Sequence, residues 1–339
     1  MYKRQIQDYL KKTPGGRAYL LVPDQGTYTA EYLLAKSFPG AGFIDVTVCG
    51  FSRLAYRVFQ ELHSPVADAL SPLGQQIILR RLLDAHKDEL QVILRAASQP
   101  HFSEKLTAFF HQLDMFLVTE DDLLAASKRE GETPLGKKLA DLSLLYKAYH
   151  DYLRMHFAYE GSLFDLLARE IPKSEKLRGS HIWIDGFNGM APQKIRIVSA
   201  LVHTAKEVTM TLQMDSPEEA AENPNFARPY QLYSQLQGAI RHSSSIVLTE
   251  EKRFRTSDLS LMARHFFERH ARPRPEDGRA KEGLHLITAE SPKEEVDLIS
   301  RTITSLVRDK GLRYRDILVL SRTPENYSCL LYTSPSPRD

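Results

Sequence analysis

Short apolar runs alternate with amphipathic stretches along much of the chain. We predict strands of one parallel sheet at residues 17–22, 43–49, 181–185 and 208–212, the first of them buried. Turn or loop residues end each of the first three runs, and a stretch with helical spacing of its apolar residues follows. Strand, loop and helix in repeated succession is the pattern of a doubly wound parallel sheet. The chain is therefore predicted to be an α/β protein.

The first of these helices follows Pro23-Asp24-Gln25-Gly26. Thr27 is its predicted N-cap, because a threonine side chain accepts a hydrogen bond from the free backbone amides of a first helical turn. The apolar positions predict that Tyr28, Tyr32 and Leu33 face the sheet.

Between residues 71 and about 171 the hydrophobic period changes to that of helices. Ser71 followed by Pro72 is typical of a helix start, and Thr119 with Asp122 has the spacing of a capping box. The sheet pattern resumes at residue 181. We therefore predict an all-helical insertion within the first α/β domain.

A second α/β unit is predicted near the end of the chain. Residues 284–288 and 316–320 are short apolar runs, and a helix pattern lies between them from Pro292 to Asp309. Strand, helix and strand in this order begin a parallel unit.

Both ends of the sequence have the pattern of translated sequencing adaptor. Residues 329–339 match one reading frame of such an adaptor, and residues 1–5 match the opposite strand. Segments of this kind are set aside before the fold is interpreted. The expectation is an internal fragment, residues 6–328, of a longer protein.

Charge and cysteine content exclude several classes of protein. The formal net charge is +2, and it becomes zero without the two predicted scars. The body of the chain is thus not globally basic, although a local groove can still be positive. Only Cys49 remains once Cys329 is set aside, which excludes a disulfide framework and a cysteine zinc site and fits a cytoplasmic protein. No apolar run approaches the roughly 20 residues of a membrane helix.

Four motifs in order carry a family resemblance. They are residues 21–25 (LVPDQ), 51–58 (FSRLAYRV), 183–187 (WIDGF) and 316–322 (DILVLSR). Together they resemble the helicase-like N-terminal half of AddB (RexB), the B subunit of bacterial AddAB ATP-dependent helicase-nucleases. The resemblance covers essentially all of residues 6–328.

The resemblance implies RecA-like domains of the P-loop, superfamily 1 helicase type. Residues 6–70 and 181–280 would form domain 1A without its first strand and phosphate loop, residues 71–180 the helical insertion 1B, and residues 281–328 the start of domain 2A. The absent strand is central in the family's sheet, so we expect uncovered strand edges around Leu20 and Ile184.

The second nucleotide motif of the resemblance is degenerate. A working motor follows its magnesium-binding aspartate with a glutamate that activates the attacking water. Here Gly186 follows Asp185, and no GxxxxGK[ST] loop occurs in the sequence. Asp185 is either a residual nucleotide-site residue or a strand-end carboxylate that holds its own turn. ATP and Mg²⁺ are expected in the intact protein, and an iron-sulfur cluster only beyond residue 328.

The resemblance also implies DNA-binding residues, in a domain that reads the Chi recombination signal on a passing single strand. Gln25, Thr27, Arg53 and Tyr56 carry over from the family, with Phe187 as a weaker stacking candidate. Tyr56 offers a stacking face, and Gln25 and Arg53 offer forked polar groups for base edges. In the alternative interpretation, Gln25 caps a turn and Tyr56 is a core residue.

The implied function lies in double-strand break repair, by DNA end resection and recombination. The expected partners are an AddA-like subunit, single-stranded DNA and DNA ends, without a membrane. Two alternatives stay open. One is an active ATP-driven superfamily 1 motor, which Gly186 disfavours. The other is a helical scaffold that binds only protein.

Overall fold

The chain folds into two compact units, Met1–Val247 and Leu248–Asp339, in a computed structural model. The structure describes residues 2–38, 45–64, 71–97, 99, 101–157, 163–240, 242–248, 254, 256–266 and 283–333. The predicted domain boundary at residue 280 lies outside the described residues.

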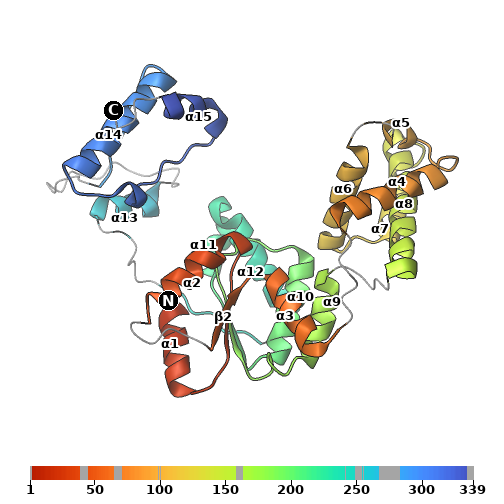
Figure 1. Cartoon of the computed structure of the whole chain (residues 1–339), viewed down its shortest axis with the longest axis horizontal. Coiled ribbons are helices and arrows are strands. Elements are labelled where there is room, and N and C mark those ends of the chain that lie inside the picture. Colours follow the sequence, from red (N-terminus) through yellow and green to blue (C-terminus); the bar gives the residue numbers. More distant parts are fainter. Residues whose placement is uncertain are drawn as a thin grey trace. The chain divides into compact units, whose positions relative to one another are not determined.

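A four-stranded parallel sheet forms the centre of the α/β part of unit 1 (Figure 1). Its strands, in spatial order, are β2 (Val46–Cys49), β1 (Ala18–Leu21), β3 (His181–Ile184) and β4 (Glu207–Met210). Strand register places Leu21 beside Cys49 on one side and Ile184 on the other. The predicted parallel α/β sheet is confirmed, with strands slightly shorter than predicted. Phe43 and Ile44, predicted to begin the second strand, lie outside the described residues.

The predicted uncovered edges at Leu20 and Ile184 are wrong. β1 pairs with both β2 and β3, and β3 pairs with both β1 and β4, so the backbones of these two strands are bonded on both sides. Among the described residues, the free edges belong to β2 and β4. The prediction failed because it placed an additional strand between β1 and β3, whereas these strands pair directly.

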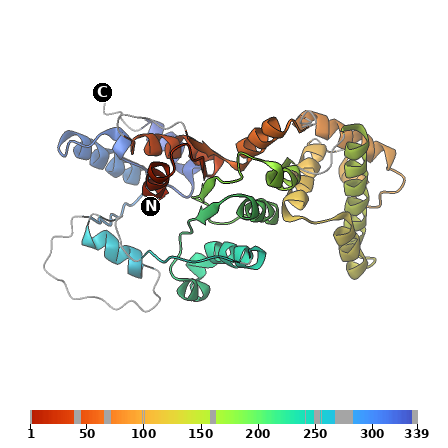
Figure 2. The ribbon, with the colours of Figure 1, turned by 90° about the horizontal axis from the view of Figure 1, so that it is seen from below.

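Helices cover both faces of the sheet. Figures 1 and 2 show the strands between α1 on one side and α3, α9 and α10 on the other. The helices of this part are α1 (Tyr2–Lys12), α2 (Thr27–Ala35), α3 (Phe51–Leu62), α9 (Leu163–Glu170), α10 (Pro192–Thr204), α11 (Pro217–Glu222) and α12 (Ala227–Ala239), with 3₁₀ turns η1 (Asp24–Gly26), η2 (Ile171–Lys173) and η3 (Pro224–Phe226).

Alternation along β1 divides the core into two layers. Leu20 packs with α1 and α2, whereas Tyr19 and Leu21 pack with α3 and its neighbours. Successive side chains of a strand point to opposite faces, so one buried strand supplies both layers. The α3 sequence fits its layer, because Phe51, Leu54, Ala55, Val58 and Phe59 are all buried on one helical face.

The predicted orientation of α2 is wrong. Tyr28, Tyr32 and Leu33 are 78%, 56% and 38% exposed, whereas Ala30 and Leu34 are the buried residues of this helix. The small Ala30 lets the helix pack closely on the sheet, and the two tyrosines stack on each other on the outside at 6.5 Å between ring centroids. The prediction chose the largest apolar residues of the helix as its buried face, and these residues lie on the exposed face.

The helical block has a hydrophobic core of its own. It contains α4 (Pro72–Ala85), α5 (Leu94–Ala97), α6 (Phe102–Phe116), α7 (Glu120–Glu130) and α8 (Pro134–Phe157). Figures 1 and 2 show α4, α6, α7 and α8 gathered together, and their core runs from Ile78 to Leu153. The predicted starts are confirmed: the Ser71 side chain caps α4, and Thr119 and Asp122 form a capping box on α7.

The segment that follows the block belongs to the sheet layer. Leu167 of α9, Ile171 of η2 and Leu177 are buried in the core beside α3 and α10. The structure therefore places residues 163–177, which the sequence assigns to the insertion, against the sheet.

Unit 2 contains α13 (Ser257–His265), α14 (Pro292–Arg308), η4 (Tyr314–Asp316) and α15 (Pro324–Thr333). The predicted helix is confirmed as α14. The two predicted strands are wrong, since residues 284–288 and 316–320 form no strand in the described part of the chain. Leu286 is 94% exposed and Leu320 is 83% exposed. An apolar run becomes a strand only where a second backbone bonds to it, and no backbone within the described residues pairs with these two.

In the part of the chain that the structure describes, no helix is both long enough and apolar enough to cross a membrane.

We predict that Cys49 resists thiol reagents in the folded protein. Burial in the sheet core raises the pKa of its thiol to about 11, so little of the reactive thiolate forms at neutral pH. Because the pKa of the Cys49 thiol is higher in the folded than in the unfolded state, the protonated thiol stabilises the fold at pH values below its unfolded-state pKa. This stabilisation is lost as the pH rises toward 11. Timed thiol labelling at neutral pH should modify the exposed Cys329 quickly and Cys49 only on unfolding. Equal labelling rates would contradict this.

Candidate functional site

The candidate DNA-binding residues gather where the strands end. Gln25 and Thr27 follow β1, and Arg53 and Tyr56 lie in the first turns of α3, which follows β2. Because β1 and β2 are parallel neighbours, their carboxyl ends meet at one edge of the sheet. Ligands of open α/β sheets bind at this edge. The structure thus places these four residues, predicted from separate motifs, on segments that follow two neighbouring strands: Gln25 in the turn after β1, Thr27 at the start of α2, and Arg53 and Tyr56 on α3.

Glycines allow the loops at this edge to approach each other closely. A Cβ on Gly50 would lie 1.8 Å from Asp24 Oδ1, so any larger residue there requires that carboxylate to move. Gly186 has φ of +81°, and a Cβ there would meet Pro23 at 3.3 Å. Loops after β1, β2 and β3 are therefore packed against one another, with the β1 loop in the middle.

Three of the four residues offer free side-chain surface. Gln25 and Arg53 are exposed, and Tyr56 is 48% exposed. Within the described residues, no side-chain hydrogen bond or ion pair engages any of the three. Thr27 differs, because its Oγ1 donates to the Asp24 carbonyl oxygen at 2.9 Å, and it is the first residue of α2 rather than its cap. The turn-capping interpretation of Gln25 and the core interpretation of Tyr56 both find no support here.

Phe187 lies deeper than these residues. It is 9% exposed and packs against Phe51, at 5.5 Å between ring centroids. Lys194 Nζ lies 5.7 Å from the Phe51 ring centroid, within cation–π range. A base could reach only the small exposed part of Phe187, so its main role in this structure is to support the loop after β3.

Asp185 is engaged inside the protein. Its Oδ1 accepts a hydrogen bond from Thr211 Oγ1, which follows β4, and its backbone amide donates to Leu21 O at 2.9 Å. The carboxylate thus ties the ends of β3 and β4 together. This resembles the structural alternative for Asp185, although the residue holds a neighbouring strand rather than its own turn.

This edge of the sheet lacks the catalytic base of a magnesium–nucleotide centre and the cysteines of an iron-sulfur cluster. Asp185 is already hydrogen-bonded, Gly186 supplies no base, and no group of three acidic, histidine or cysteine side chains converges in the described part. An iron-sulfur cluster is held by four cysteine thiolates in its common forms, and the chain has two cysteines. No chemical step is therefore assigned to this edge of the sheet.

Sequence reasoning missed three supporting residues: Asp24, Thr211 and Lys194. A signal existed for Thr211, because parallel register that pairs Ile184 with Met210 also puts the next residues, Asp185 and Thr211, side by side. The proximity of Asp24 to Gly50 and the position of Lys194 over Phe51 depend on tertiary packing, which the sequence pattern does not encode.

We predict that Gly50→Ala costs about 1 kcal/mol of unfolding free energy, because the new methyl group must push the Asp24 carboxylate out of its rotamer. In an Asp24→Ala background the same substitution should cost far less. Urea unfolding of the four proteins in this cycle measures the difference. Equal costs in both backgrounds would show that the two loops do not touch in this way.

Comparison with known proteins identifies the family. Residues 1–263 match the family described as "ADDB, N-terminal". The chain is 33% identical over 338 residues to a protein of Pelotomaculum thermopropionicum, 32% identical over 349 residues to one of Bacillus velezensis, and 33% identical over 337 residues to one of Bacillus subtilis. Each relative is named as the B subunit of an ATP-dependent helicase/deoxyribonuclease. These matches cover 95–96% of this chain and 29% of each relative. The chain belongs to the AddB family and corresponds to its N-terminal part.

Proposed function

We propose that this chain is the single-strand-scanning, Chi-recognising part of an AddB-type subunit that acts in DNA end resection and recombination. The observation that carries the proposal is the free surface of Gln25, in the turn after β1, and of Arg53 and Tyr56, in the first turns of α3 after the neighbouring strand β2. The four-stranded part of unit 1 is proposed to be a RecA-like domain 1A, with α4 to α8 as its helical insertion.

The chemistry of these side chains suits a single strand better than a duplex. Exposed bases stack on aromatic side chains, and such stacking is worth about 1 to 3 kcal/mol per base. Tyr56 offers such a face, while the Arg53 guanidinium and the Gln25 amide offer paired hydrogen-bonding groups that distinguish one base edge from another. Recognition in this account requires no hydrolysis at the site.

The alternative of an active motor at this sheet is disfavoured by Asp185 and Gly186. The carboxylate that a motor would use for magnesium is bonded to Thr211, and the position of the catalytic glutamate holds a glycine. Energy for DNA movement is then proposed to come from an AddA-like partner subunit. The proposed substrates are DNA ends and the single strand released from them.

The proposal is tested in an intact AddAB-type heterodimer that carries Tyr56→Ala or Arg53→Ala in this subunit. Both variants should unwind and cut DNA at normal rates, because the proposed motor and nuclease centres lie elsewhere. They should fail to change cutting at the recombination signal, and Arg53→Ala should relax discrimination at one base by about 1 to 3 kcal/mol.

Unchanged signal response in both variants, together with a lower melting temperature, would show that the two residues are structural. Normal response with normal stability would place recognition elsewhere on the protein.

A further inference from the structure

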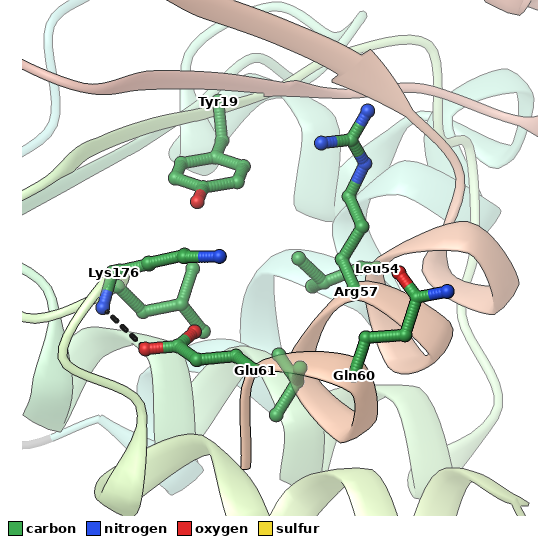
Figure 3. Close-up of a pocket in the computed structure, with 8 residues that line it drawn as sticks. Tyr19, Leu54, Arg57, Gln60, Glu61 and Lys176 are labelled. Atoms are coloured by element: carbon green, nitrogen blue, oxygen red, sulfur yellow. Dashed lines mark hydrogen bonds between the residues drawn. The ribbon is translucent and has the colours of Figure 1, made fainter. Parts of the chain in front are cut away.

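A small pocket lies between α3, β1 and the loop before β3. Its volume is about 160 Å³, and its polar lining includes Tyr19, Arg57, Gln60, Glu61 and Lys176 (Figure 3). Pockets for drug-sized ligands or cofactors hold roughly 300 to 1,000 Å³. The pocket is therefore too small for a nucleotide and large enough for a small ion with its waters.

Tyr19 brings an unpaired hydroxyl to this pocket. Tyr19 lies on β1 and is 8% exposed as a residue, and its hydroxyl, which has no hydrogen-bond partner among the described residues, is open to the pocket rather than buried. Burial raises the pKa of Tyr19, although Arg17 and Arg57 oppose that effect, so the hydroxyl stays protonated and able to donate.

The charges around the pocket leave a positive excess. Both oxygens of the Glu61 carboxylate are already used, since one accepts from Ser174 Oγ at 2.7 Å and the other from the Lys176 backbone amide at 2.9 Å, the dashed line of Figure 3. Glu61 thus fixes the loop that closes the pocket. The Arg57 guanidinium forms no ion pair with any described residue, and Lys176 adds a second positive charge to the lining.

We propose that this pocket binds a phosphate-class oxyanion through the Tyr19 hydroxyl, the Arg57 guanidinium and the Lys176 ammonium group. The three donors come from a strand, a helix and a loop that line one pocket, so an anion held there would be contacted by separate elements of the fold. Arginine binds phosphate oxygens in pairs, which makes Arg57 the main anchor. The anion is either free phosphate or a backbone phosphate of DNA.

Calorimetric titration of the 339-residue protein with inorganic phosphate, at constant ionic strength against chloride, tests the site. Arg57→Gln should weaken phosphate binding about tenfold or more, and Tyr19→Phe about three- to tenfold. Arg196→Gln, which changes an exposed arginine of α10, should have no effect. Circular dichroism confirms that each variant is folded.

A saturable affinity that both pocket variants lose supports the proposal, whereas general stabilisation by phosphate would not saturate. Absence of saturable binding, or full binding in both folded pocket variants, overturns it.

A competition experiment with single-stranded DNA that carries no terminal phosphate identifies the source of the anion. Phosphate that weakens DNA binding in the wild type but not in Arg57→Gln indicates a backbone phosphate, and unaffected DNA binding indicates a free anion. Since phosphate binding is measured without DNA, this test can succeed or fail independently of the proposed function.

Discussion

Asp141→Ala should destabilise the helical block by about 3 to 4 kcal/mol. The Asp141 side chain on α8 is 3% exposed, and its carboxylate accepts hydrogen bonds from the backbone amides of Gln91, Val92 and Ile93 at 2.8–3.1 Å. Alanine would leave three amides without a partner just before α5. Each buried unpaired donor costs about 1 to 3 kcal/mol, partly relieved by relaxation and by water.

A matched control lies on the same helix. Asp151 is an exposed carboxylate of α8 whose partner is Arg154, so Asp151→Ala should cost less than about 1 kcal/mol. Urea unfolding gives both free energies, and hydrogen exchange of residues 91–93 reports the local effect. Similar costs for the two substitutions would mean that the Asp141 carboxylate does not hold this turn.

Leu34→Ala should destabilise the α/β part of unit 1 by about 3 to 5 kcal/mol. Leu34 of α2 is fully buried against β1 and β2, and truncating a buried leucine loses its transfer free energy and leaves a cavity. Its neighbour Leu33 is 38% exposed, so Leu33→Ala should cost less than about 1 kcal/mol.

Thermal and urea unfolding of the two variants determine which face of α2 meets the sheet. This orientation matters for the site, because α2 begins at Thr27 and fixes the loop that carries Gln25. Should Leu33→Ala be the costlier change, α2 would be rotated and the exposed position of Gln25 would need revision.

The sequence predicts the sheet well because the runs that became β1, β2 and β3 are largely apolar and buried, and the half-buried β4 still shows β-branched residues at 208 and 209. The prediction fails where apolar residues do not mark a buried face or a paired strand. Tyr28 and Tyr32 look like core residues by hydrophobicity but lie outside, and the runs at 284–288 and 316–320 form no strand because no backbone pairs with them. The order of the strands in the sheet could not be predicted either, because it depends on which backbones hydrogen-bond to each other and not on the composition of each strand.

The candidate site is predictable to the extent that it follows from strand ends. Gln25 and Arg53 come directly after neighbouring parallel strands, so one edge must collect them. The residues that position them depend on packing: Asp24 beside Gly50, and Thr211 bonded to Asp185. The pocket around Tyr19 could not be predicted from the sequence, because a tyrosine within an apolar run is typical of a core residue and does not indicate a pocket.

Single-stranded DNA binding by the 339-residue chain tests the central claim most directly. Fluorescence anisotropy should show that Tyr56→Ala binds more weakly than wild type by about 1 to 3 kcal/mol. Tyr314→Ala, which changes a tyrosine of similar exposure in unit 2, should bind as wild type does. The account predicts this difference with unchanged melting temperatures. Equal affinities of all three proteins would contradict a surface on α3 that binds single-stranded DNA. A loss of affinity in Tyr56→Ala that is accompanied by a lower melting temperature would contradict it as well.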